Sequence, residues 1–547
     1  MDKNTKIGFN VVAIVCILIF SAVLAPITLQ NDTFYTIKIG EHILQNGIDM
    51  AKDPFSFHDI PYTYPHWLYD VAIYVIYSIG GMVGIYISTI ILSCILGITI
   101  YFTNKKIVKN DLVSFLLTLG VMYVLGAFIA ARAQLFTYIL FTLQILFIEK
   151  FIETKKKRYA LGLIVIPIII ANVHLAVWPF YFVPFLPYIV EYLIALILDS
   201  HLIYKFKIRN IKNKIEKLSK LQGNEEKITK LKETYKKIEE KFEKYKQNQE
   251  YRREHPYKLK IERKDNSKWL IVIMIICLFT GLLTPLGDTP YTYLVKTMQG
   301  NTTKSINEHL PMVLIQNTHT LTILAIVLSI LIFTDTKIRL KDFFMLGGLI
   351  ILSLMSRRQL SMLVILGVYS VNRLITDLFN KYDPAGTDSL IKAISNIFGK
   401  TITILLVVLL SICICKAQIK DKFVDERAYP VKAAEYVKEN LNLEEIRLYN
   451  EYNYGSYLLY QGIPVFIDSR ADLYTPEFNG DKDKDVFTDF LNVSSLSVHY
   501  EDIFDKYEIT HLLIPNNAKM NLFIEQDDNY EELYKDDNFV IYERLSK

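Results

Sequence analysis

Long runs of apolar residues recur along most of the chain and predict helices that cross a membrane. The runs 7–29, 82–102 and 112–131 exceed the roughly 18 residues that mark a spanning helix. Short polar loops separate the spans, which we place at about 7–29, 82–102, 112–131, 134–152, 159–178, 180–199, 269–286, 317–334, 342–356, 359–376 and 400–418. We therefore predict a mainly α, polytopic helical membrane protein with about eleven spans. The number of spans can differ by one or two, because the short apolar run 67–80 is compatible with a re-entrant segment.

Residues 200–268 depart from this pattern and are strongly polar. Their apolar residues recur at alternating spacings of three and four, the seam of a coiled coil: Ile208, Ile211, Ile215 and Leu218, then Ile228, Leu231, Tyr235, Ile238, Phe242 and Tyr245. Gly223-Asn224 separates the two stripes as a helix end followed by a helix start. The pattern predicts an antiparallel helical hairpin, which either docks a partner or an anionic lipid or is simply a solvated insertion.

After the last span, short β-like runs alternate with amphipathic helices. The pattern predicts helices at 431–441 and 498–507 and strands at 446–450, 465–468, 511–515 and 539–543. The domain organisation that follows is an N-terminal transmembrane module (1–199) with a first external loop (30–66), the hairpin insert (200–268), further transmembrane helices (269–418) and a small α/β domain (419–547).

The net charge of +4 conceals a strong division along the chain. Residues 201–268 hold 22 Lys/Arg against 11 Asp/Glu, whereas residues 419–547 hold 14 against 27. Because cytoplasmic loops carry an excess of Lys and Arg, we predict that the N-terminus and the insert are cytoplasmic and that the C-terminal domain, up to Lys547, is extracytoplasmic. The alternative for residues 1–25 is a cleaved signal peptide. The five cysteines show no zinc or CxxC spacing, so they do not fix a redox compartment.

The first external loop carries the most informative polar residues. Asp32 follows the first span directly, and residues 33–46 predict an amphipathic helix lying on the membrane. Asp53 precedes a proline. Capping of the helix by Asp32 and a turn role for Asp53 are the structural alternatives to catalysis. Further polar side chains fall at the same predicted face, where cations suit a phosphate-bearing ligand and a carboxylate suits general-base work: Glu41, His66, Asp70, Arg132, His174, Glu308, Arg357 and Arg358.

This first external loop resembles that of the GT-C superfamily of polytopic glycosyltransferases, and the resemblance is closer to a bacterial branch of it. The motifs that carry it cover most of the chain outside the insert: Asp32, Gly40-Glu41, Asp53-Pro54-Phe55-Ser56, Trp67-Leu68, Asn453-Tyr454-Gly455-Ser456-Tyr457-Leu458 and Val465-Phe466-Ile467-Asp468-Ser469-Arg470-Ala471-Asp472-Leu473-Tyr474. The resemblance implies a membrane-embedded enzyme of the bacterial cell envelope, in the plasma membrane, that uses a polyprenyl-phosphate-linked sugar.

The resemblance also implies residue roles. Asp32 would deprotonate or orient an acceptor hydroxyl, which attacks the anomeric carbon of the lipid-phosphate sugar with inversion. Asp53 is the next catalytic candidate, and Arg132, Arg357 or Arg358 would stabilise the phosphate leaving group. The acidic pair or Asp-x-Asp that is common in the superfamily is missing here, because Asp32 is flanked by Asn31 and Thr33. The cofactor therefore stays unknown, with a divalent metal such as Mg²⁺ or Mn²⁺ left open.

The motif at 465–474 has two interpretations. Asp468, Arg470, Asp472 and Tyr474 either face the membrane groove and bind the acceptor, or form a structural knot in which Arg470 pairs with Asp468 or Asp472. The acceptor itself is an extracytoplasmic glycan, lipid or protein.

Two other function classes compete with the transferase. A flippase or transporter of a lipid-linked glycan would use the same cations without catalysis, and an oligosaccharide polymerase or ligase would use external arginines without an acid after the first span. No Walker A motif and no Ser-His-Asp arrangement is legible, which argues against ATP-driven transport. Membrane lipids are expected partners, and nucleic acid is not.

Overall fold

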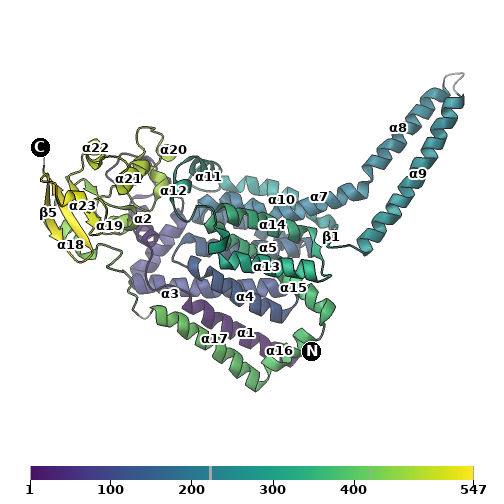
Figure 1. The fold of residues 1–547 in the computed structure, drawn as a ribbon, viewed down its shortest axis with the longest axis horizontal. Helices are drawn as coiled ribbons and strands as arrows, with labels where there is room; N and C mark the ends of the chain where they lie inside the picture. The colour runs from purple at the N-terminus through teal and green to yellow at the C-terminus, as the bar shows by residue number, and fades with distance from the viewer. Residues whose placement is uncertain (1, 221–224, 419, 546–547) are drawn as a thin grey trace.

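The protein is elongated, with its C-terminal domain at one end and a projecting pair of helices at the other (Figure 1). The computed structural model describes residues 2–220, 225–418 and 420–545, so the predicted turn at Gly223-Asn224 and the terminal Lys547 lie outside the described residues. Between the two ends lies a bundle of helices aligned with the long axis. The N-terminus lies at the end of the bundle remote from the C-terminal domain.

Each of the eleven predicted spans coincides with a helix of the bundle. They are α1 (Lys3–Val23), α3 (Trp67–Val108), α4 (Asp111–Leu125), α5 (Ala133–Thr154), α6 (Lys157–Val173), α7 (Leu186–Ser200), α10 (Lys268–Leu278), α13 (Thr318–Phe333), α14 (Leu340–Met355), α15 (Leu360–Tyr382) and α17 (Ile397–Gln418). Among the described residues, eight helical stretches are long and apolar enough to cross a membrane, and α13 is a shorter apolar helix. The prediction of a mainly helical, polytopic fold is confirmed.

The short apolar run 67–80 forms the first part of α3. It joins the spanning part of that helix at Gly81, whose backbone has φ 59° and ψ −151°. Glycine adopts positive φ without a steric penalty, so α3 breaks at this point and its first part can follow a different direction. This first part is helical and connects the first external loop to the spanning part of α3.

Helix α2 (Asn31–Asn46) joins the bundle to the C-terminal domain. Its buried face packs against α3 and against α19 (Tyr452–Tyr460). Phe34 makes edge-to-face contacts with Tyr429 and Tyr457, which cover the apolar face. A Cβ atom at Gly40 would overlap the backbone carbonyl of Asp70, so glycine permits the close approach of α2 and α3.

The insert forms the predicted hairpin of helices, α8 (Leu202–Ser219) and α9 (Glu225–Glu254), which project beyond the bundle (Figure 1). The seam residues of α8 are less exposed than their neighbours, and Phe242 of α9 is buried. Tyr204 of α8 stacks on Phe242 with ring centroids 5.3 Å apart. The coiled-coil periodicity therefore identified the packed face of each helix.

The C-terminal domain (residues 420–545) contains a small mixed sheet with strand order β3-β4-β6-β5. Strands β3 (Leu448–Tyr449) and β4 (His511–Pro515) are parallel, and β6 (Phe539–Arg544) pairs antiparallel with β4 and with β5 (Tyr530–Lys535). Its helices are α18 (Val431–Asn440), α19, α20 (Pro476–Asn479), α21 (Val486–Ser495), α22 (Tyr500–Lys506) and α23 (Asn521–Ile524). The predicted strand at 465–468 is reduced to a single bridge between Val465 and Ser56.

One hydrophobic core runs through the first external loop and the C-terminal domain. It includes Phe34, Tyr62 and Tyr64 from the loop and Leu448 and Ile467 from the domain. Because the two regions share this core, the loop is held rigidly over the end of the bundle. That arrangement builds the walls of the main cavity.

Candidate functional site

A cavity of about 900 Å³ lies where the bundle meets the C-terminal domain. A volume of this size is typical of ligand sites. Four regions line it: α2 and the first loop, the near ends of the bundle helices, the loop that contains α11 (Thr289–Gln299) and α12 (Thr302–Ser305), and the C-terminal domain. Of the predicted site residues it contains Asp32, His66, Arg132, His174, Glu308, Arg358 and Arg470.

Asp32 lies in the first turn of α2 and does not cap the helix. The N-cap residue is Gln30, and its side chain makes no capping hydrogen bond. The Asp32 carboxylate instead pairs with the Arg132 guanidinium, with Oδ2 and Nη2 2.9 Å apart and both side chains about one quarter exposed. The capping alternative is therefore wrong, because the helix begins one residue before Asp32 and the carboxylate is turned toward the cavity.

Arg132 bridges two carboxylates. Besides Asp32, its guanidinium lies 3.5 Å from Glu308 Oε1. Burial by itself would lower the pKa of Arg132, but the charges of Asp32 and Glu308 outweigh burial and raise it. A permanently charged guanidinium thus stands between two acids that are 276 positions apart in the sequence.

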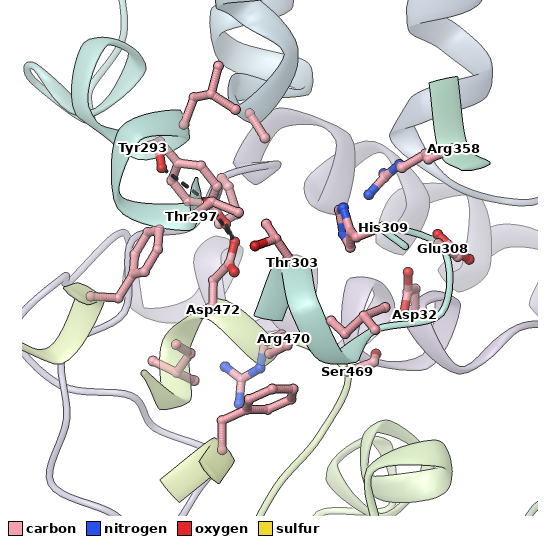
Figure 2. A pocket seen from close by; sticks show the side chains of 18 of the residues that line it. Asp32, Tyr293, Thr297, Thr303, Glu308, His309, Arg358, Ser469, Arg470 and Asp472 are labelled. Atoms are coloured by element: carbon pink, nitrogen blue, oxygen red, sulfur yellow. Dashed lines mark hydrogen bonds between the residues drawn. The ribbon is translucent and has the colours of Figure 1, made fainter. Parts of the chain in front are cut away.

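Arg358 is held in place by backbone pairing. The Arg358 N–H donates to the carbonyl of Glu308 at 3.0 Å, and the Arg357 N–H donates to the carbonyl of Leu310 at 3.1 Å. Figure 2 shows Asp32, Glu308, His309 and Arg358 around one part of the cavity. The Arg358 side chain forms no ion pair with any residue that the structure describes, so its charge is available to a ligand. Burial and then the Arg358 charge lower the pKa of His309.

Two histidines lie together in the lining of the same cavity. The rings of His66 and His174 have centroids 5.0 Å apart. Burial lowers the pKa of His66 to about 4, so this imidazole is neutral at pH 7. Neutral imidazoles beside arginines can accept or donate hydrogen bonds to a ligand without adding charge.

Arg470 joins the C-terminal domain to the first external loop. Its guanidinium pairs with Asp468 at 2.7 Å and with Asp53 at 2.6 Å, and the three side chains are 3%, 0% and 0% exposed. Tyr474 donates a further hydrogen bond to Asp468 at 2.6 Å. The guanidinium of Arg470 lies over the ring of Tyr62, with its central carbon 4.7 Å from the ring centroid. Asp53 is fully buried, pairs with Arg470 and does not line the cavity. The predicted structural knot forms, with Asp53 as an additional partner of Arg470.

Asp472 ties the domain to the second long loop. Its carboxylate accepts hydrogen bonds from the hydroxyls of Tyr293 and Thr297 at 3.0 Å and of Thr302 at 2.9 Å. Figure 2 shows Asp472 facing Tyr293 and Thr297. The motif at 465–474 therefore fastens both long loops around the cavity, the first through Arg470 and the second through Asp472.

Three other predicted residues lie outside the cavity lining. Glu41 pairs with Lys38 at 2.7 Å along α2. Asp70 is fully buried near the start of α3. Arg357 donates to the side-chain oxygen of Asn307 at 2.5 Å. Glu41, Asp70 and Arg357 therefore do not face the cavity around Asp32, although Arg357 contacts its lining residue Asn307.

Sequence reasoning missed an aromatic wall on the far side of the cavity. Its members are Tyr452, Phe478, Phe487 and Phe490 of the C-terminal domain and Tyr293 of α11. Phe487 and Phe490 could not be recognised from the sequence, because aromatic residues on the apolar face of an amphipathic helix look like ordinary core residues. The one sequence signal for this wall was the aromatic and glycine stretch at 453–458, which Tyr452 directly precedes.

The acids near Asp32 do not form a ready-made metal site. Among the described residues, no three His, Cys, Asp or Glu side chains gather as metal ligands. Arg132 occupies the space between Asp32 and Glu308, and a guanidinium repels a divalent cation at that position. The donor set as placed does not fit Mg²⁺ or Mn²⁺.

Comparison with known proteins shows which fold this is. The chain matches no protein-family model and no curated sequence. Its structure is similar to that of the Archaeoglobus fulgidus oligosaccharyltransferase tethered by a disulfide bond to an acceptor peptide with the NVT sequon, with a TM-score of 0.52, 11% identity and coverage of 98% of this chain and 74% of the other. The apo form of that enzyme gives a TM-score of 0.52, 12% identity and coverage of 92% and 69%. At these identities the similarity shows a shared fold and no more: this chain has the fold of that oligosaccharyltransferase.

Proposed function

We propose that the protein is an inverting glycosyltransferase that moves a sugar from a polyprenyl-phosphate-linked donor to an acceptor at the outer face of the plasma membrane. The observation that carries this proposal is the cavity in which Asp32 lies among Arg132, Glu308 and Arg358, at one end of a helix bundle with a GT-C fold. The loop charges support placing that end outside the cell.

The donor phosphate would bind to the arginines. Arg358 has no carboxylate partner among the described residues. Arg132 pairs with Asp32 and Glu308 and has further N–H groups that can donate to a phosphate oxygen. Apolar side chains of the bundle, including Phe180, Leu352 and Met355, line the same cavity and suit the start of a polyprenyl chain. The cavity thus combines a cationic pocket with an apolar path toward the lipid.

In the reaction, the acceptor hydroxyl or amide attacks the anomeric carbon on the face opposite the phosphate. The bond from the acceptor to that carbon forms while the bond from the carbon to the phosphate oxygen breaks, so the configuration inverts. Asp32 takes the acceptor proton, and the lipid phosphate leaves with the electron pair. Arg132 and Arg358 stabilise its developing negative charge.

The acceptor would lie against the aromatic wall of the C-terminal domain. Tyr452, Phe487 and Phe490 offer flat apolar surfaces that suit the ring of a sugar or an extended peptide. The similar oligosaccharyltransferase was solved with an acceptor peptide, which favours a protein among the acceptor classes. A glycan or a lipid acceptor fits the same wall.

Sugar transfer by the purified protein in detergent tests this proposal. A flippase needs two compartments, so transfer in a detergent solution separates an enzyme from a transporter. We expect Asp32→Asn to lower turnover by at least about 10²-fold, because an amide cannot accept a proton. The matched control is Asp425→Asn, which removes an Asp that is paired with the exposed Arg427 and lies away from the cavity. Near-normal turnover by a folded Asp32→Asn protein would contradict the assignment.

A further inference from the structure

A second cavity, which we call the basic cavity, lies at the other end of the bundle. It has a volume of about 680 Å³ and is lined by the end of α3, the end of α5, the segment 262–266 and the start of α14. Arg132 precedes the first residue of α5, and Lys150 lies near the end of that helix. Twenty-two helical residues span about 33 Å, close to the roughly 30 Å of a bilayer core. The two cavities therefore face opposite surfaces of the membrane.

The basic cavity carries an excess of positive charge. Seven Lys or Arg and four Asp or Glu side chains line it. Lys341 pairs with Glu149 at 2.8 Å and Lys150 pairs with Glu153 at 2.6 Å. Lys106 and Lys109 are exposed and form no ion pair with any residue that the structure describes. These two ammonium groups are available to an anion.

The backbone adds to the positive potential. Helix α14 begins at Leu340, with Arg339 as its N-cap, and both Arg339 and Lys341 line the cavity. The N-terminus of a helix carries a partial positive charge and unpaired N–H groups. A 16-residue helix thus points its positive end at the same space as the free lysines.

An interfacial tryptophan marks the depth of the basic cavity. Trp269 follows its lining residue Asn266 by three positions and is 40% exposed. The ammonium groups of Lys155 and Lys268 lie 5.0 Å and 5.8 Å from its ring centroid. Tryptophan flanked by lysines is typical of the level of lipid headgroups. The cavity therefore opens where phospholipid phosphates lie.

We propose that the basic cavity binds the phosphate of an anionic phospholipid headgroup. Basic pockets between transmembrane helices are suited to such headgroups, because the phosphodiester pairs with the lysines while the acyl chains stay in the bilayer. The proposal concerns a site remote from Asp32, and it does not depend on the transferase activity.

Native mass spectrometry of the delipidated full chain tests this proposal. The probes are phosphatidylglycerol, phosphatidylcholine and inorganic phosphate. We expect phosphatidylglycerol to bind at least about tenfold more tightly than phosphatidylcholine. Each lysine near an anionic lipid contributes roughly a fivefold gain in affinity. The double variant Lys106→Glu/Lys109→Glu should therefore lose at least about tenfold in affinity for phosphatidylglycerol.

Two further variants make the result decisive. Lys106→Gln/Lys109→Gln introduces no new charge and should show a smaller loss in the same direction. Lys432→Glu/Lys438→Glu makes the same charge change at exposed positions of α18 in the C-terminal domain and should bind like the wild type. Unchanged binding in the Lys106/Lys109 variants, or an equal loss in the α18 control, would overturn the site. Equal binding of the two lipids together with tight binding of inorganic phosphate would overturn the lipid as its ligand.

Discussion

Replacing Arg470 by methionine should release the C-terminal domain from the first external loop. Methionine keeps an apolar stem of similar length but removes the guanidinium that pairs with Asp53 and Asp468. Both carboxylates are fully buried, so neither can be rehydrated without opening the interface. Breaking a buried ion pair in this way costs about 3–5 kcal/mol. For a domain of this size, that loss corresponds to a fall in Tm of roughly 10–20 °C.

The assay follows the C-terminal domain specifically. The three tryptophans, Trp67, Trp178 and Trp269, all lie outside it, so intrinsic tryptophan fluorescence reports on the bundle. Limited proteolysis of the full chain along a temperature ramp, with the C-terminal fragments identified by mass, reports on the domain. The matched control is Arg427→Met, which removes an exposed pair with Asp425 and should leave the Tm close to that of the wild type.

A triple variant separates charge from packing. Asp53→Asn and Asp468→Asn combined with Arg470→Met remove all three buried charges, so we expect it to recover at least half of the lost Tm. A Tm for Arg470→Met within experimental error of the wild type would refute the account of Arg470 as the fastening between loop and domain. Lost sugar transfer with an unchanged Tm would move Arg470 to a role in acceptor binding.

Three further predictions follow from other contacts. Burial lowers the pKa of His58 from 6.5 to about 4, so the folded protein holds this imidazole neutral. The free energy of unfolding should therefore be highest above pH 6.5 and fall by up to about 3 kcal/mol as the pH drops to 4. Thermal ramps at pH 7 and pH 4.5 should show a smaller fall in Tm for His58→Gln than for the wild type. A Cβ atom at Gly455 would overlap the carbonyl of Ile467, so Gly455→Ala should cost about 1–3 kcal/mol in the same proteolysis assay, and an unchanged Tm would refute that tight contact. In a cysteine-free background of intact cells, a cysteine at Lys519 should react with an impermeant thiol reagent and one at Lys230 should not, and labelling of Lys230 from outside would contradict the proposed topology.

Much of the fold was predictable because hydropathy reports directly on membrane helices. All eleven predicted spans correspond to helices, and the spacing of three and four located the packed faces of α8 and α9. The strand at His511–Pro515 was predicted at its observed bounds. The bounds of α2 were less predictable, because Gln30 gives no capping signal and the helix starts before Asp32.

The residues around Asp32 were predictable only as a group at one face. Arg132, Glu308 and Arg358 fall in turns on the same predicted side of the membrane, which brings them near Asp32. The sequence does not specify which of these side chains form ion pairs. The pairing of Asp53 with Arg470 joins positions 417 residues apart, and no periodicity encodes such a contact. The three hydroxyls on Asp472 were missed for the same reason, since threonine and tyrosine in an external loop have no distinguishing pattern.

A density map of the protein with a donor analogue tests the central claim most directly. The analogue is a polyprenyl-linked sugar in which a phosphonate carbon replaces the oxygen that would leave. The account predicts phosphonate density against Arg132 and Arg358, with the anomeric carbon facing the Asp32 carboxylate. Density for the sugar phosphonate outside this cavity, or with Asp32 turned away from the anomeric carbon, would contradict it.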